Sequence, residues 1–335
     1  MIKVGLIGCG FMGGMHSACY KVLEPMGVKL VAVADVRPEF AQKVASEDTE
    51  IYACGMDLIE KADVDLIDIC LPTHLHTAHA VAAMKKGRNV MIEKPICFED
   101  DEMELLLKTE KETGVKVQVG HCVRHGLPNR WLKETVDSGV YGTIKHAEFY
   151  RLSGKPTWAW ENWLHQVEKS GSVALDMHIH DADLARYLMG DPDTVKAQAQ
   201  RDAEGAIQQI STVYGYGNNV SVSLEAGWDF PENFPFTSGW RVKFEKATAV
   251  LEGATVTVYT EDGEVITPEL VPEYNGTNNI GGNVSSLGAY YDELKYLIEG
   301  LQGKNDLSVA TISEAVASVR LCKREIAAAG GLWVK

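Results

Sequence analysis

The first 120 residues alternate short apolar runs with stretches of helical periodicity. The apolar runs are rich in Val and Ile and show no polar face, which is typical of parallel strands buried on both sides. They are Ile2–Ile7, Lys29–Ala34, Leu66–Leu71, Asn89–Ile92 and Lys116–Val119. Helices are expected between them at 12–25, 38–46, 56–62, 75–86 and 100–113. This strand–helix alternation predicts a doubly wound α/β domain with a parallel sheet over residues 1–120.

The pattern changes after residue 120. Polar and apolar residues alternate along the segments between 194 and 267, which is typical of an antiparallel sheet with one solvated face. The clearest of these strands are Thr212–Tyr216, Val220–Ala226, Trp240–Phe244 and Thr255–Tyr259. A strand at 143–153, helices at 128–138, 175–189, 286–300 and 309–328, and an Asn- and Gly-rich loop at 273–285 complete this half. Residues 121–335 are therefore expected to form a second α/β domain with a large, open, mostly antiparallel sheet.

Composition narrows the class of protein. The chain has 335 residues, 45% of them hydrophobic and 24% charged, which suits about two soluble domains at ~150 residues each. Its formal net charge of −15 argues against nucleic acid and anionic membranes as partners. No signal peptide is recognisable at the N-terminus. The 7 cysteines are scattered without a CxxC pair, so neither a disulfide framework nor a zinc site is expected, and we expect a cytoplasmic protein.

A glycine-rich turn carries the strongest chemical signal. Gly8, Gly10 and Gly13 lie between the first strand and the first helix, with Phe11 and Met12 opening that helix. In such a GxGxxG turn the first glycine permits a tight bend, the second lets a pyrophosphate approach, and the third allows close helix packing. The helix N-terminus then favours the anion. The turn predicts a dinucleotide site.

Asp35 follows the second strand and indicates which dinucleotide binds. A carboxylate there accepts hydrogen bonds from the adenosine ribose and repels a 2′-phosphate, so NAD is expected rather than NADP. Arg37 leaves an alternative open, because an arginine can pair with the 2′-phosphate or stack on the adenine.

Two further loops follow predicted strands and face the same end of the sheet. The first loop holds Leu71, Pro72, Thr73 and His76, and the second holds Glu93 and Lys94. Ligands bind at this end of open α/β sheets, so these residues are candidates for cofactor contacts, although Thr73 would equally serve as a helix cap. His74, His76 and His79 are not expected to bind a metal, because i, i+2 spacing on a helix separates side chains and no carboxylate accompanies them.

The predicted helix at 175–189 carries a candidate general base. Asp176 and His180 are four residues apart and would share a face, so the carboxylate can orient the imidazole. That pair is the arrangement of an activated base, although such pairs are also common on solvated helix faces. His178 is expected to be a packing residue, and Asp183 a cap or a salt-bridge partner.

These motifs together resemble the glucose–fructose oxidoreductase, inositol dehydrogenase and MocA family (Gfo/Idh/MocA). The resemblance rests on GxGxxGxxH at residues 8–16, Glu-Lys-Pro at 93–95, and Asp-x-x-x-His at 176–180. It implies a Rossmann domain that binds NAD, catalytic roles for Lys94, Asp176 and His180, and a cis peptide before Pro95. It also implies a homodimer or homotetramer built through the open sheet, a state that the scarcity of helices after that sheet independently favours.

The resemblance is weaker around the substrate pocket. Family members often carry a phenylalanine and paired arginines after the sixth strand, where this chain has residues 120–125, including Arg124. Arg124, Arg151 and Trp163 are the candidate substrate contacts. Trp158, Trp160 and Trp163 would either stack on sugar rings or belong to a hydrophobic core.

The expected function is NAD-dependent oxidation of a secondary hydroxyl on a sugar, glycoside or cyclitol. A redox-neutral glycoside-cleaving enzyme or lyase that retains NAD is the main alternative. A non-catalytic sensor of NAD or sugar is a third, but it would not need Lys94, Asp176 and His180 together.

Overall fold

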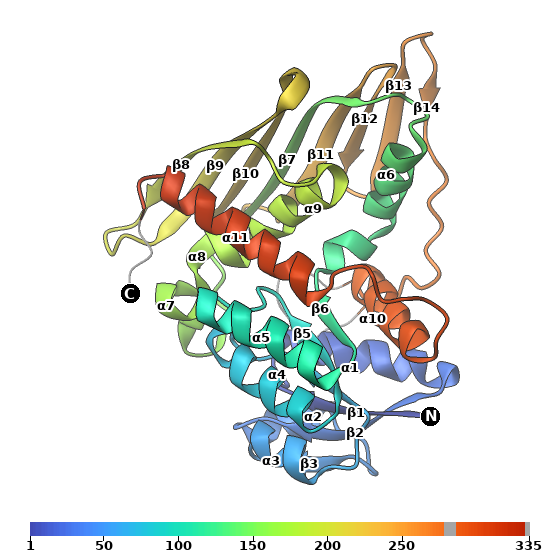
Figure 1. The fold of residues 1–335 in the computed structure, drawn as a ribbon, viewed down its shortest axis with the longest axis vertical. Coiled ribbons are helices and arrows are strands. Elements are labelled where there is room, and N and C mark those ends of the chain that lie inside the picture. Colours follow the sequence, from blue (N-terminus) through green and yellow to red (C-terminus); the bar gives the residue numbers. More distant parts are fainter. Residues whose placement is uncertain (278–285, 332–335) are drawn as a thin grey trace. The chain divides into compact units, whose positions relative to one another are not determined.

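The computed structural model describes residues 1–277 and 286–331 and divides the chain into two compact units (Figure 1). The first unit joins Met1–His125 to Glu273–Ala317, and the second joins Gly126–Pro272 to Ser318–Lys335. The first part of unit 1 ends at His125, five residues beyond the expected boundary at residue 120. The unit also takes in residues 273–317, which were expected in the second domain. Most of the loop expected at 273–285 falls on residues outside the described ranges.

The first unit is built on a parallel sheet. In the described part of the chain its six strands run in the order β3-β2-β1-β4-β5-β6. They are β1 (Ile2–Ile7), β2 (Val28–Ala34), β3 (Glu50–Tyr52), β4 (Leu66–Ile69), β5 (Asn89–Glu93) and β6 (Val117–Gly120). The helices are α1 (Phe11–Leu23), α2 (Pro38–Val44), α3 (Gly55–Lys61), α4 (His76–Lys85), α5 (Asp100–Thr113) and α10 (Gly288–Leu301). The strand order and parallel pairing confirm the predicted doubly wound fold.

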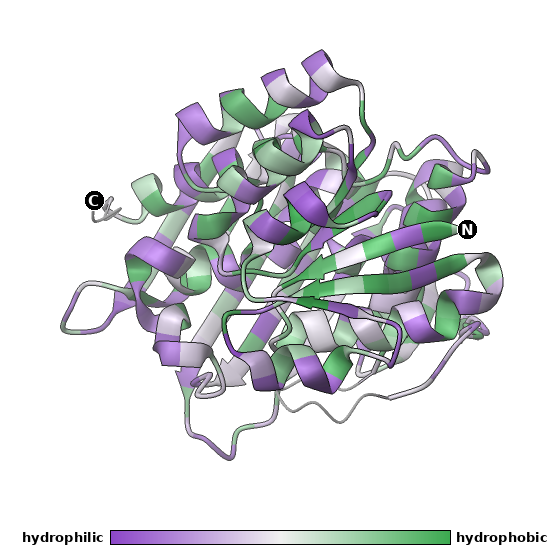
Figure 2. Ribbon diagram, turned by 90° about the horizontal axis from the view of Figure 1, so that it is seen from below, coloured by the Kyte–Doolittle hydropathy of each residue, from purple (hydrophilic) through white to green (hydrophobic). Residues whose placement is uncertain are grey.

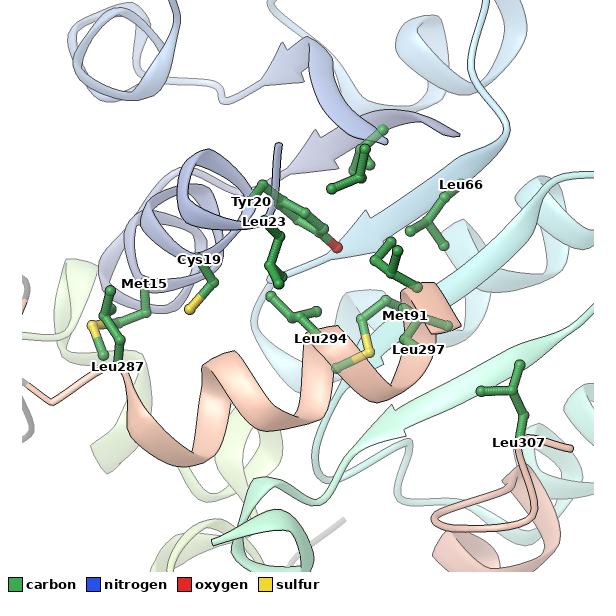
Figure 3. Packing of buried hydrophobic residues seen from close by; sticks show 13 residues of the cluster. Met15, Cys19, Tyr20, Leu23, Leu66, Met91, Leu287, Leu294, Leu297 and Leu307 are labelled. Carbon is green, nitrogen blue, oxygen red and sulfur yellow. The ribbon is translucent and has the colours of Figure 1, made fainter. Parts of the chain in front are cut away.

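Helices cover both faces of this sheet. On one face, α1 and α10 pack over Val4, Leu66 and Met91 in a core that Figure 3 shows from close by. On the other face, α3 approaches so closely that a Cβ at Gly5 would lie 2.6 Å from the Leu58 side chain. The apolar side of α10 has its partners on α1, and this packing explains why a segment so late in the sequence joins the first unit.

The second unit contains the open sheet that the sequence predicts. Within the described residues its eight strands run in the order β14-β13-β12-β11-β7-β10-β9-β8. They are β7 (Ile144–Gly154), β8 (Thr194–Arg201), β9 (Ile207–Tyr216), β10 (Val220–Phe230), β11 (Thr237–Phe244), β12 (Ala247–Glu252), β13 (Thr255–Thr260) and β14 (Val265–Ile266). Only the β7–β10 pair is parallel among these described pairings, so the sheet is mostly antiparallel.

The helices of the second unit gather on one side of its sheet (Figure 1). They are α6 (Leu127–Ser138), α7 (Val167–Ser170), α8 (Ser172–Asp176), α9 (Ile179–Met189) and α11 (Ile312–Ala328), the last of which begins in the first unit. Tyr214 on this side is buried, whereas its neighbour Val213 on the opposite face is 47% exposed. The apolar residues of the alternating sequence pattern thus lie on the covered face of the sheet, and the residues between them lie on the open face.

Hydropathy follows this architecture. Figure 2 shows the strands of the parallel sheet largely in green and the surrounding helices striped green and purple, as expected for buried strands and amphipathic helices. In the described ranges, every helix is either too short or too polar to cross a lipid bilayer.

Candidate active site

The turn between β1 and α1 has the shape that a bound pyrophosphate requires. Gly8 has φ +88°, and a Cβ there would lie 2.4 Å from the carbonyl oxygen of Cys70. A Cβ at Gly13 would lie 1.9 Å from the carbonyl oxygen of Gly8, so both glycines are needed for packing. At Gly10, by contrast, a Cβ would meet only Arg37 Nη2, at 3.8 Å, among the described residues. The turn is therefore open where a phosphate would lie, and no acidic side chain stands in the first turn of α1.

Asp35 holds this turn from the end of β2. Its Oδ2 accepts the Cys9 N–H at 2.8 Å, and its Oδ1 accepts the Arg37 N–H at 2.8 Å. Arg37 Nε lies 3.3 Å from the same Oδ1, and its guanidinium carbon is 3.8 Å from the centre of the Phe40 ring. The Arg37 side chain is thus held over the turn between a carboxylate and an aromatic face.

The loops after β4 and β5 lie side by side because these strands are hydrogen-bonded neighbours. His76 is fully buried between them, with Nδ1 2.9 Å from the Pro95 carbonyl oxygen and Nε2 2.7 Å from that of Leu71. His76 therefore ties the Leu71–Pro72 loop to the Lys94–Pro95 loop. The Lys94–Pro95 peptide is cis, which confirms that expectation.

Lys94 projects from a firmly anchored backbone. The Glu93 carboxylate folds back so that its Oε2 accepts the Lys94 N–H at 3.0 Å. Glu93 is 4% exposed, and Lys94 is only partly buried. The lysine thus stands at the ligand-facing edge of the sheet while the preceding residue is buried beneath it.

Behind these loops lies a buried group of charges to which the sequence analysis assigned no role. His16 on α1 faces Asp68 of β4 and Glu93 of β5, and all three side chains are at least 94% buried. The signal available in the sequence was the histidine that ends the GxGxxGxxH motif, three residues beyond Gly13 on the buried side of the helix. Its carboxylate partners come from distant strands, and periodicity alone does not pair them.

The predicted helix at 175–189 is broken between the two residues of the proposed base pair. Asp176 is the last residue of α8 and His180 the second residue of α9. The His178 N–H bonds back to the Val173 carbonyl, five residues earlier, and the His180 N–H to that of Met177, three residues earlier. The expected continuous helix, with Asp176 and His180 on one face, is therefore wrong in detail. The helical turn at this point is first wider and then tighter than an α-helical turn, and such irregular turns recur at functional sites.

Neighbouring polar residues fix the start of α9. His178 is fully buried, and its Nε2 lies 2.8 Å from Glu325 Oε1 on α11. The Glu325 carboxylate raises the pKa of His178 although burial opposes this. Asp183 Oδ1 accepts a 2.6 Å hydrogen bond from Ser318 Oγ, which ties α9 to α11.

The three candidate substrate residues have different surroundings. Arg124 is 2% exposed, with Nη2 3.3 Å from Glu314 Oε2, and Arg151 binds Asp181 through two 3.0 Å hydrogen bonds. Trp163 is half-buried, whereas Trp158 and Trp160 are 42% and 44% exposed. Of the two interpretations for the tryptophans, a hydrophobic core therefore does not describe Trp158 and Trp160.

Family models match most of the chain. Residues 2–121 match the oxidoreductase family GFO_IDH_MocA, described as an NAD-binding Rossmann fold. Residues 129–265 match the GFO/IDH/MocA C-terminal domain. The two matched ranges correspond closely to the parallel and the mostly antiparallel sheet.

Characterised proteins with similar sequences include inositol dehydrogenases. Inositol 2-dehydrogenase of Rhizobium meliloti is 30% identical over 229 residues, covering 67% of this chain and 65% of that protein. Myo-inositol 2-dehydrogenase of Thermotoga maritima is 29% identical over 262 residues, covering 69% of this chain and 75% of that protein. The match to the first of these thus spans slightly less than two thirds of its length.

A solved structure shows the same fold over almost the entire chain. Levoglucosan dehydrogenase in complex with NADH and levoglucosan superposes with a TM-score of 0.81 at 20% identity, covering 98% of this chain and 97% of that one. At this identity the likeness concerns the fold.

Proposed function

The chain belongs to the GFO/IDH/MocA family of oxidoreductases with an NAD-binding Rossmann domain, and we propose that it oxidises a secondary hydroxyl of a sugar, glycoside or cyclitol. The observation that carries this proposal is the open glycine turn anchored by Asp35, on the same sheet edge as Lys94. Relatives named inositol 2-dehydrogenase and a structural neighbour named levoglucosan dehydrogenase support the substrate class.

Within this function, the residues of the first unit hold the cofactor. The N–H groups at the start of α1, from Phe11 to Gly13, would bind the pyrophosphate at the opening beside Gly10. Asp35 binds the adenosine ribose and favours NAD over NADP, because a 2′-phosphate would meet its carboxylate. Leu71, Pro72 and Thr73 line the path toward the nicotinamide.

Lys94 and His180 act on the substrate hydroxyl in this proposal. His180, oriented by Asp176, accepts the hydroxyl proton, and the Lys94 ammonium donates a hydrogen bond to the same oxygen as negative charge develops there. When bound, NAD supplies the acceptor for the hydride that leaves the carbon. Arg124, Arg151 and Trp163 remain the candidates for contacts with the rest of the substrate.

We further propose that the protein is a cytoplasmic homodimer or homotetramer associated through the open face of its large sheet. The covered face carries α8, α9 and α11, whereas the opposite face presents Val213, 47% exposed, and Tyr259, 51% exposed. Exposed apolar side chains on a broad sheet favour association with a second copy.

The decisive experiment incubates the purified protein with NAD and a panel of inositols, hexoses, nucleotide sugars and glycosides. NADH absorbance and product mass are followed together. We expect NADH to accumulate in step with an oxidised product that is two hydrogen atoms lighter. A product without net NADH would favour the redox-neutral lyase or glycosidase instead, and NAD binding without any product across the panel would favour a sensor.

A further inference from the structure

The buried charges behind the glycine turn form a continuous chain of contacts. His16 Nδ1 lies 2.8 Å from Asp68 Oδ2, and His16 Nε2 lies 3.2 Å from Glu93 Oε1. The side chains of His16 and Asp68 are 0% exposed and that of Glu93 is 6% exposed. Because each ring nitrogen lies within 3.2 Å of a carboxylate oxygen, two anionic neighbours favour the charged imidazolium at this place.

The charge state follows from the same geometry. Burial alone would lower the pKa of His16, but the Asp68 carboxylate and Cys70 together reverse this and raise the pKa well above its ordinary value. Burial likewise would raise the pKa of Glu93, but its contact with His16 and the charges of His16 and Lys94 lower it. At neutral pH the group is therefore an imidazolium between two carboxylates.

Both ends of this series of contacts, Asp68 and Glu93, are held in place. The Tyr20 hydroxyl donates to Asp68 Oδ2 at 2.8 Å, and Cys70 Sγ lies 3.3 Å from His16 Nδ1. At the other end, a Cβ at Gly120 would lie 3.1 Å from Glu93 Oε2, so glycine at this position leaves room for the carboxylate. That same Oε2 accepts the Lys94 N–H at 3.0 Å.

Helix α10 closes the far side of the group. The ring of Tyr290 is 6.4 Å from the ring of His16, and Glu293 is fully buried close by. Burial, together with the charges of Glu93 and Asp68, raises the pKa of Glu293 well above its ordinary value, which favours its neutral form. The titratable groups around Glu93 and His16 are Tyr20, Asp68, Cys70, Lys94, Cys122, Tyr290 and Glu293.

We propose that His16 is a positioning residue for the reaction: from its place between Asp68 and Glu93 it fixes the Glu93 carboxylate, and Glu93 in turn fixes the backbone from which Lys94 reaches the substrate. This inference rests on the proposed function, which gives Lys94 its role.

A purely structural role accounts less well for these observations. A buried ion group contributes little stability beyond that of apolar side chains of the same volume, because desolvation offsets the attraction. The last side chain of this charged group, Glu93, directly precedes Lys94 in the sequence. A displacement of about 1 Å in a positioned group can lower the rate up to ~10²-fold. A buried group of this kind is suited to placing Lys94 precisely.

The test compares His16→Gln and Glu93→Gln with wild type in the full-length protein, using the substrate found in the panel. Each variant should lower kcat roughly 10- to 100-fold while the dissociation constant for NADH, measured by fluorescence, changes less than about threefold. His79→Gln is the matched control, because the Nδ1 of this histidine on α4 lies 2.8 Å from the Leu75 carbonyl oxygen, within one helical turn of its own position, and the substitution should leave kcat unchanged. Thermal unfolding of every variant checks that the fold persists.

A double-mutant comparison separates positioning from general damage. If His16 acts through Lys94, His16→Gln should have almost no further effect on kcat in a Lys94→Ala background. Additive losses would overturn the positioning role, as would wild-type kcat in His16→Gln. Wild-type kcat in Lys94→Ala would instead contradict the proposed function itself.

The pH dependence of kcat gives a second test. Without the His16 cation the pKa of Glu93 rises, so kcat of His16→Gln should fall at acid pH beyond the fall that protonation of the His180 base causes in wild type, until it equals that of Glu93→Gln. Wild type should show only the fall due to His180. A profile parallel to that of wild type would contradict the proposal. Should His16→Gln not fold, Glu93→Gln and its combination with Lys94→Ala test the same link without a change in α1.

Discussion

Single side chains at the end of β2 decide how the cofactor loop is held. Asp35 bonds the Cys9 N–H through one oxygen and the Arg37 N–H through the other, so the carboxylate shapes the turn in addition to its proposed contact with the ribose. Its two tasks can be separated by substitution, because Asn retains an oxygen acceptor whereas Ser is too short to reach the Cys9 N–H.

We expect wild type to bind NAD more tightly than NADP, measured as dissociation constants by calorimetry. Asp35→Ser should bring the dissociation constants of NAD and NADP closer together, because it removes the carboxylate that repels a 2′-phosphate. It should also weaken NAD binding, because the turn loses its anchor. Asp35→Asn should narrow the ratio with a smaller loss of NAD affinity. Equal or tighter binding of NADP to wild type would show that Arg37 dominates.

For the proposed base, His180→Ala should lower kcat by about 10²–10⁴-fold, the usual value of general-base assistance. NAD affinity should change little, because the glycine turn and Asp35 belong to the other unit. Asp176→Asn should cause part of the same loss, and the double variant should be hardly worse than His180→Ala, since both act on one proton. Wild-type turnover by His180→Ala at saturating NAD and substrate would place the base elsewhere.

Glu293 should make stability depend on pH. Its folded pKa is raised above the ordinary 4.5, so the stability it contributes is complete below pH ~4.5 and is lost as pH rises toward the folded pKa. As the pH rises from ~4.5 toward the folded pKa of Glu293, the free energy of unfolding should therefore fall more steeply in wild type than in Glu293→Gln, by up to ~1.4 kcal/mol per pH unit. Urea unfolding at several pH values measures this. The exposed Glu104→Gln is the control and should keep the wild-type slope.

The sequence predicted the residues whose roles depend on local backbone geometry. Gly8, Gly10 and Gly13 are readable because a strand, a turn and a helix in succession require them. The partners of His16 were not predicted, because Asp68 and Glu93 come from two other strands and only the sheet order brings them together. The contact of Arg124 with Glu314 was likewise not predicted, because the two residues are 190 positions apart in the sequence.

At the scale of elements, most strands and helices lie where hydrophobic periodicity placed them. The short edge strand β3 was missed because only three residues pair and two of them are exposed. The break between α8 and α9 was missed because its residues are all compatible with a helix, and the irregular hydrogen bonds depend on the packing of His178 against Glu325. Periodicity reports which face is buried, and here the buried face continues across the break.

The packing of α10 on α1 can be tested through stability. Leu294 is fully buried in the core of the first unit, so Leu294→Ala should lower the free energy of unfolding by about 2–5 kcal/mol, measured by denaturant titration. Leu105, 42% exposed on α5, provides the control, and Leu105→Ala should stay within ~0.5 kcal/mol of wild type. A small effect at Leu294 would mean that α10 adds little to this core.

At the scale of the whole molecule, the open sheet face should bring copies of the chain together. Light scattering of wild type at micromolar concentration should give a mass of two or four times 36.7 kDa. Val213→Asp places a charge on that face and should shift the protein toward the monomer, whereas Leu105→Asp in the first unit should not. A single 36.7 kDa species in wild type would contradict the proposed assembly.

The division of the chain into units also has a consequence for its synthesis. The core under α1 needs Leu287, Leu294 and Leu297, yet roughly 150 residues of the other unit separate His125 from Glu273. About 265 residues separate the end of α1 from the start of α10, so at about 5–20 residues per second the apolar side of α1 waits some ~13–53 s before α10 is made. During that interval the nascent chain presents an unfinished hydrophobic surface, which is the kind of surface that chaperones bind.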